Sequence, residues 1–233
     1  MKKNTKVVII FLSLMIFLVS VLGAVTTSVF ELDFYTKSQQ KHEVAKKLNL
    51  SQQEVSEATI VSLLYTKGLT KELVYKTEVD GEIVDLYSSQ DKEHMVDVKD
   101  LYAGAYYVLL AGIVGIFTSM IVLFFLRKSF NTFSLTLLFN KVSLYSLVFV
   151  GVVALFAFVN FNQFWTFFHK IFFRNDLWLM DYNKDLLVNI FPAGLFMDLV
   201  FKIIARFFAI FGLANLTAYG YRLMSLKRMK TND

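Results

Sequence analysis

Hydrophobic side chains fill four long stretches of the chain, and charged residues gather mainly in the segments between them. The four predominantly apolar stretches are 7–29, 101–126, 142–159 and 194–221. Each is adequate for the roughly 20 apolar residues that a membrane-spanning helix requires. The pattern therefore predicts an all-α integral membrane protein with four transmembrane helices.

The first apolar stretch begins like a secretory signal peptide, with lysines before a hydrophobic run. However, no charge occurs from Val7 to Phe30, which is longer than the usual hydrophobic region of a signal peptide. Leu22-Gly23-Ala24 is also a poor cleavage site, because the position two before the alanine is not small. We expect this stretch to be retained as the first span.

The polar segment after the first span is expected to be small and mostly helical. Ser51 and Glu54 fit a capping box that begins a helix, and Gly68 is placed to end it. Asp80-Gly81 lies between two short strand-like runs and predicts a hairpin turn. The segment is too poor in apolar residues for an independent core, so we expect it to pack against the membrane helices.

Two patterns within the spans indicate how the helices pack. Small residues recur every four positions in the second span, at Ala111, Gly115 and Ser119, which permits close helix contact. Charged residues recur every four positions in the fourth span, at Asp198, Lys202 and Arg206. An internal ion-pair series that holds the bundle together and a substrate-binding role both remain open for these three.

Basic residues determine the expected orientation. They gather at both termini and in the segment between the second and third spans, as the positive-inside rule predicts for the cytoplasmic side. The predicted cytoplasmic segments are 1–6, 127–141 and 222–233, and the predicted extracytoplasmic segments are 30–100 and 160–193. All three histidines then lie outside the cytoplasm.

Composition removes several classes of function. The chain contains no cysteine, which excludes disulfide scaffolds, thiol catalysis and thiolate metal sites. The net charge is +5, and the basic residues flank the hydrophobic spans. We therefore expect these residues to contact membrane lipids and not nucleic acid.

The first candidate chemical group is His94. Residues 91–102 are expected to be helical and continuous with the second span, so Asp97 shares a helix face with His94 and can orient its imidazole. The alternative is a solvated charged face, which this spacing alone does not remove.

The second candidate is His169, which lies in an aromatic segment. The aromatic residues Phe161, Phe164, Trp165, Phe168 and Phe172 keep helical spacing, which predicts an amphipathic helix in the membrane interface. A simple membrane anchor remains the alternative. Chemistry is favoured because both histidines are predicted at one membrane surface, and imidazole is the usual general acid–base group.

A metal site is a competing hypothesis. His94, Asp97, His169 and Asp176 can provide two imidazoles and two carboxylates for zinc or iron, although no HExxH or comparable ligand spacing is present. His42 lies in a charged helical stretch and is expected to be a surface residue.

Three motifs carry a resemblance to a known family: ELDFY (31–35), HMVDVK (94–99) and FHKIFFRNDLWLMD (168–181). Together with the four-span layout, they resemble the lipoprotein intramolecular transacylases of Gram-positive bacteria over essentially the whole chain. One departure is visible, since the family tends to have proline after the aspartate that ends the last motif, and Tyr182 stands there.

The resemblance implies an enzyme of the cell membrane that acts on diacylated lipoproteins without a cofactor or metal. The sn-2 acyl chain would move to the α-amino group of the N-terminal cysteine, leaving a lyso-form lipoprotein. His94 and His169 match the family's histidine motifs as catalytic residues. The expected supporting residues are Asp97, Lys99, Arg174, Asn175 and Asp176, and the expected substrate-binding residues are Trp165, Phe168, Phe172 and Trp178. A metal-dependent membrane lipid hydrolase and a non-enzymatic membrane scaffold remain the alternatives.

Overall fold

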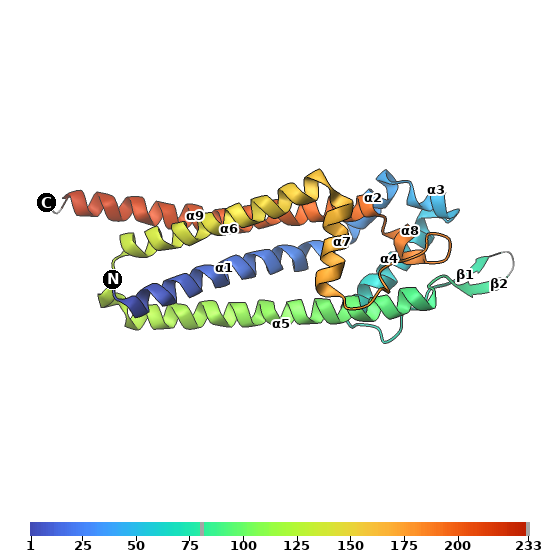
Figure 1. Cartoon of the computed structure of the whole chain (residues 1–233), viewed down its shortest axis with the longest axis horizontal. Helices are drawn as coiled ribbons and strands as arrows, with labels where there is room; N and C mark the ends of the chain where they lie inside the picture. Colours follow the sequence, from blue (N-terminus) through green and yellow to red (C-terminus); the bar gives the residue numbers. More distant parts are fainter. Residues whose placement is uncertain (80–81, 232–233) are drawn as a thin grey trace. The chain divides into compact units, whose positions relative to one another are not determined.

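The computed structural model describes residues 1–79 and 82–231, and nearly all of its elements are helices (Figure 1). The elements in chain order are α1 (Lys3–Val29), α2 (Leu32–Lys41), α3 (Val44–Leu48), α4 (Gln52–Thr66), β1 (Lys76–Val79), β2 (Glu82–Asp85), α5 (Ser89–Phe125), the 3-10 helix η1 (Arg127–Ser129), α6 (Thr132–Val159), α7 (Phe161–Phe172), α8 (Leu186–Ile190) and α9 (Ala193–Thr231). Helices α1, α5, α6 and α9 are long and apolar enough to cross a membrane. The prediction of a four-span α-helical membrane protein is confirmed.

The chain divides into two compact units. The first contains residues 1–26, 106–155 and 202–233, and the second contains 27–105 and 156–201. Helices α5 and α9 begin in the second unit and continue along the chain into the first.

Aromatic contacts hold three helices of the first unit together. Phe207 and Phe211 of α9 are buried, and the ring of Phe17 on α1 meets both edge-on at 5.8 Å between centroids. Leu147 and Val150 of α6 pack against the same group. Figure 1 shows these parts of α1, α6 and α9 running side by side.

Small residues bring α5 close to α1, as expected for part of the predicted stripe. A Cβ added to Gly115 would meet Met15 at 3.2 Å, and one added to Gly112 would meet Val19 at 2.8 Å. Ser119 is buried, whereas Ala111 is exposed. The contact therefore uses Gly112 in place of Ala111, while Gly115 keeps its predicted place against α1.

The second unit has a hydrophobic core of its own. Its buried residues are Ala58, Tyr65, Leu73, Tyr87, Met95, Leu186, Leu187 and Ile190. They come from α4, the segment around the hairpin, the first turns of α5, and α8. Segment 30–100 does not build this core alone, as expected, because α8 from segment 160–193 supplies Leu186, Leu187 and Ile190.

Local sequence signals in this unit act as predicted. The Ser51 hydroxyl accepts from the Glu54 backbone N–H and the Glu54 carboxylate accepts from the Ser51 backbone N–H, which completes the capping box of α4. Gly68 follows the helix with a positive φ of 75°. Strands β1 and β2 pair antiparallel, while the predicted turn at Asp80-Gly81 lies outside the described residues.

Helix α6 begins earlier than the apolar pattern suggested. It starts at Thr132, within the predicted loop 127–141. The Asn131 side chain accepts a hydrogen bond from the Ser134 backbone N–H at 2.8 Å, which caps the helix, and neither glycine nor proline follows before the apolar stretch.

Candidate functional site

The two predicted histidines lie together in the second unit. His94 is in the first turns of α5 and His169 is in the last turn of α7. Their ring centroids are 6.1 Å apart and their planes differ by 27°, so the rings are nearly parallel. Both residues are buried, with 7% and 6% of their surface exposed. A pair of imidazoles from distant parts of the sequence therefore shares one enclosed site.

The start of α5 is fixed by a reciprocal cap one turn before His94. The Ser88 hydroxyl accepts from the Asp91 backbone N–H, and the Asp91 carboxylate accepts from the Ser88 backbone N–H, both at 3.0 Å. The same carboxylate accepts from the backbone N–H groups of Leu186 and Leu187 at 2.9 and 3.2 Å. Asp91 thus caps α5 and α8 together and fixes the helix that carries His94.

The tautomer of His169 follows from its hydrogen bond. Its Nδ1 lies 2.7 Å from the backbone carbonyl oxygen of Trp165, one turn earlier in α7. A carbonyl oxygen only accepts, so the proton of the neutral ring must be on Nδ1. The Nε2 atom of His169 therefore has the free lone pair that a general base requires.

Aromatic rings enclose the pair. Phe173 contacts both imidazoles, at 5.1 Å from His94 and 5.4 Å from His169 between centroids. Trp178 stacks on His169 at 4.9 Å, and Trp165 meets the same ring edge-on at 4.7 Å. The surroundings of the two rings are apolar, which disfavours a charged imidazolium.

Burial keeps both imidazoles neutral at neutral pH. His94 precedes the apolar part of α5, and burial lowers its pKa to about 4, with the neighbouring His169 adding to the effect and Asp97 opposing it. Burial also lowers the pKa of His169, although the hydrogen bond to Trp165 opposes this. The Nδ1 atom of His94 is buried and has no hydrogen-bond partner among the described residues.

Asp97 does not orient His94 directly, contrary to expectation. Its carboxylate accepts a hydrogen bond from the Asn175 side chain at 2.8 Å, and no hydrogen bond joins it to His94 in the described part of the chain. The Asn175 side-chain oxygen accepts from the Leu177 backbone N–H at 3.1 Å. Asp97 therefore ties the segment after α7 to α5.

The remaining predicted supporting residues lie elsewhere or on the surface. The Lys99 ammonium lies 4.7 Å from the centre of the Tyr65 ring in α4. Five residues along a helix correspond to a turn of about 140° from His94, so Lys99 is on another side of α5. Arg174 and Asp176 are exposed. The structure does not bring Lys99 to the imidazole pair.

The predicted substrate-binding aromatics form a continuous stack along α7. Trp165 lies parallel to Phe168 at 5.3 Å, and Phe168 contacts Phe172 at 4.8 Å. Trp165 also stacks on Phe196 of α9 at 4.3 Å.

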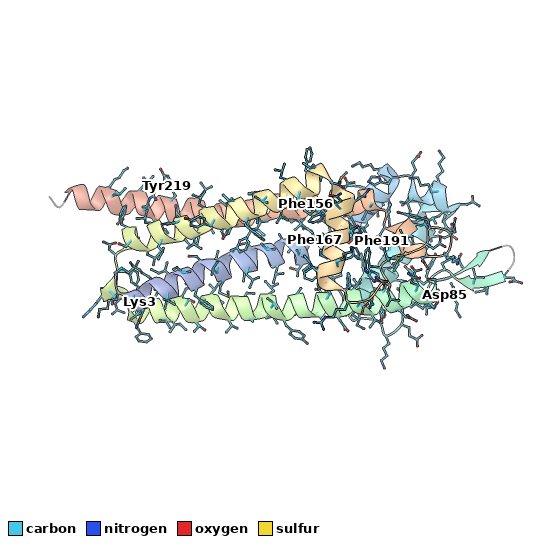
Figure 2. The ribbon with its side chains drawn as sticks, viewed as in Figure 1. Lys3, Asp85, Phe156, Phe167, Phe191 and Tyr219 are labelled. Atoms are coloured by element: carbon cyan, nitrogen blue, oxygen red, sulfur yellow. The ribbon has the colours of Figure 1, made fainter. Side chains whose placement is uncertain are left out.

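Beside this stack, α7 exposes apolar side chains, of which Phe167 and Ile171 are each 58% exposed. Figure 2 labels Phe167 beside Phe156 at the end of α6, and their ring centroids are 6.4 Å apart. An apolar, partly exposed face and an opposite exposed polar face with Gln163 and Lys170 fit the predicted interfacial helix.

Two residues near the pair were missed in the sequence. Phe173 directly follows α7 and contacts both imidazoles; it stands four residues after His169, so the helical spacing could have indicated it. Gln90 donates side-chain hydrogen bonds to the segment after α7. It stands four residues before His94, so the spacing along α5 could have indicated that it shares the same face.

The third histidine is not a simple surface residue. The Nε2 of His42 lies 3.0 Å from the Asp198 carboxylate, which also accepts from Ser38 at 2.9 Å and Lys41 at 2.7 Å. A Cβ at Gly194 would overlap the His42 ring. Asp198 therefore joins α9 to α2, rather than serving only the charge series predicted along α9.

The metal hypothesis lacks a donor set. Within residues 1–79 and 82–231, no group of three or more His, Asp or Glu side chains is arranged to hold a metal ion. The proposed set failed because Asp97 bonds to Asn175 and Asp176 is exposed.

The fold and the site together define a membrane-integral protein with a buried, neutral imidazole pair. Residues 9–196 match the model of the lipoprotein intramolecular transacylase Lit family. The chain belongs to this family, and it is therefore an enzyme, a lipoprotein acyltransferase of the membrane.

Solved structures show the same fold. The membrane integral lipoprotein intramolecular transacylase Lit from Bacillus cereus matches with a TM-score of 0.79 at 20% identity, over 97% of this chain and 98% of that chain. A variant of that protein with one histidine replaced by arginine matches with a TM-score of 0.72 at 18% identity, over 99% and 95% of the two chains. No curated protein sequence gives a significant match.

Proposed function

We propose that the protein moves the sn-2 acyl chain of a lipoprotein's diacylglyceryl group onto the α-amino group of its N-terminal cysteine. The product is a lyso-form lipoprotein with an amide-linked chain. Family membership supports the substrate class. The observation that carries the chemistry is the pair of buried rings of His94 and His169, 6.1 Å apart.

The reaction needs a base that works near neutral pH. The α-ammonium group has a pKa of about 7.7–8.0, so most of the nucleophile is protonated at neutral pH. A neutral imidazole can remove the proton that the amine loses as it attacks the ester carbonyl. Donor and acceptor belong to one molecule, and oriented reactants of this kind reach effective molarities of about 10⁵–10⁸ M.

One imidazole could take the proton from the amine and return it to the glycerol oxygen, but two adjacent rings allow the base and acid roles to be divided. We assign the base to His169, because its Nδ1–H is fixed and its Nε2 is free. The nitrogen–carbon bond forms, the carbon–oxygen ester bond breaks, and the departing glycerol oxygen receives the proton that the amine lost. A neutral His94 donates its own proton to that oxygen only while it gains the proton held by His169.

The aromatic stack would hold the acyl chain. Trp165, Phe168 and Phe172 present one row of rings along α7, and Trp178 covers His169. Apolar surface of this kind suits a hydrocarbon chain whose ester reaches the imidazole pair. Asp97 and Asn175 would support the site by fixing the segment that carries Trp178.

The site would face the outer leaflet, with both termini in the cytoplasm. Basic residues in segments 1–6, 127–141 and 222–233 support this orientation. The segments 30–100 and 160–193 would both lie outside, and their shared hydrophobic core is consistent with a common side.

The test uses a synthetic diacylated lipopeptide with different acyl chains at sn-1 and sn-2, incubated with the protein in liposomes. Tandem mass spectrometry should find the sn-2 chain on the α-amino group. His94→Ala and His169→Ala should lower the rate by about 10²–10⁴-fold, the usual contribution of general acid–base catalysis. His42→Ala, which alters the third histidine, is the matched control and should remain active. An N-linked sn-1 chain, or full activity of both site variants, would refute the proposal.

A further inference from the structure

The Trp178 ring packs against one imidazole of the pair, yet Trp178 lies on a segment without regular structure. Residues 173–185 form no helix or strand. The Trp178 indole N–H donates to the Asn175 carbonyl at 3.0 Å, and its ring stacks on His169 with 29° between the planes. The His169 ring is held on one side by its hydrogen bond to the Trp165 carbonyl and on the other by the Trp178 ring, so its orientation depends in part on what holds this segment in place.

A single side chain holds the backbone on both sides of Trp178. The Gln90 amide nitrogen donates to the carbonyl oxygens of Leu177 and Leu179, at 3.0 and 2.9 Å. Both of its N–H groups are thus used, and since both partners are carbonyls, the amide nitrogen must be the atom that faces them. Rotation of the segment would break at least one of these bonds.

Gln90 holds this segment from the helix that carries the other histidine. Gln90, His94 and Asp97 lie at helical spacing on α5, so they share one face. Gln90 binds the backbone beside Trp178, and Asp97 binds the Asn175 side chain. The segment is therefore bonded to α5 by one residue that precedes His94 and by one that follows it.

We propose that Gln90 is a positioning residue of the imidazole pair, which fixes Trp178 and through it the ring plane of His169. The role rests on the proposed function, because it presumes that the two histidines carry the reaction. Gln90 acts through Trp178 and does not itself touch the His169 ring. Its loss would leave both imidazoles present but misaligned, and a misplacement of about 1 Å can cost about 10²-fold in rate.

The test compares Gln90→Met and Gln90→Glu with the wild-type chain in liposomes, using a diacylated lipopeptide. Methionine keeps the length of the side chain without a donor, and glutamate turns an acceptor toward two carbonyls. We expect kcat to fall by about 10–100-fold in the methionine variant, and further in the glutamate variant, with a smaller change in KM. Gln53→Met is the matched control, because Gln53 donates its side-chain hydrogen bond to Glu57 on the surface of α4.

A second measurement separates positioning from general stability. The chain has two tryptophans, so 5-fluorotryptophan labelling gives two ¹⁹F resonances, which Trp178→Phe assigns. Gln90→Met should shift the Trp178 signal, leave the Trp165 signal in place and keep the thermal midpoint. Unchanged kcat, an unmoved Trp178 signal, or a rate loss that only follows a lower thermal midpoint would overturn the role of Gln90. An active His169→Ala variant would instead refute the proposed function.

Discussion

The second unit holds two histidine clusters whose surroundings are opposite in character. The rings of His94 and His169 are enclosed by aromatic side chains, and neither imidazole has a charged hydrogen-bond partner among the described residues. The ring of His42 instead faces the Asp198 carboxylate, which also accepts from Lys41. An apolar enclosure leaves ring nitrogens free for a substrate, whereas a carboxylate partner occupies the ring and ties two helices together. We therefore expect the first cluster to govern rate and the second to govern stability.

The largest effect should come from removing the charge of the second cluster. Asp198→Asn keeps the shape of the side chain but weakens three hydrogen bonds between α9 and the end of α2. Because hydrogen bonds to charged groups contribute about 1.5–3 kcal/mol, the free energy of unfolding should fall by a comparable amount. Denaturant unfolding in detergent measures it. Activity per folded molecule should be retained, and a stable variant that is inactive would reverse the comparison.

The next effect should come from making the first cluster resemble the second. Phe173→Asp places a carboxylate beside both imidazoles, which favours their charged form and raises the pKa of each by about 1–3 units. In the wild type, burial lowers the pKa of both rings, so they stay neutral as the pH falls through 6.5. In the variant the base gains a proton at a higher pH than in the wild type, so the ratio of the rate at pH 5.5 to the rate at pH 7.5 should be lower in the variant. Phe173→Leu, which adds no charge, is the control for the lost ring.

The profile of the wild type sharpens this result. As the pH is lowered, the rate of the wild-type enzyme should fall only because the substrate amine gains a proton. The pH–rate profile should show no further break near pH 6.5. A second break near that pH in the wild type would show that the rings titrate normally.

The smallest effect should come from Trp178→Phe. Phenylalanine keeps an aromatic ring over His169 but loses the N–H bond to the Asn175 carbonyl. A neutral hydrogen bond contributes about 0.5–1.5 kcal/mol, so kcat should fall by about threefold. Single-turnover kinetics with the lipopeptide measures the step. A loss as large as that of His169→Ala would mean that the indole N–H takes part in the chemistry.

The sequence predicted what depends on local pattern and missed what depends on tertiary partners. Hydropathy gave the four spans, and Ser51 and Glu54 gave a helix start, because both are properties of neighbouring residues. The meeting of His94 and His169 was predicted only as a shared membrane surface, together with the family resemblance. Asp97 was assigned to His94 by helical spacing, yet Asn175 from a distant segment takes its carboxylate. Similarly, Asp198 was assigned to a charge series along its own helix, yet its carboxylate accepts from Ser38 and Lys41 of α2.

Helix α5 is unbroken from Ser89 to Phe125, so it fixes where His94 lies along the helix axis relative to the apolar stretch of the same helix. At 1.5 Å per residue, the imidazole of His94 lies about 10 Å along the axis from the start of the apolar stretch at Leu101. Inserting one residue between His94 and Leu101 would lift the ring by only about 1.5 Å but swing it through about 100°. The direction in which His94 points around the α5 axis therefore matters more than its position along that axis. A change in that direction would separate the His94 ring from the His169 ring.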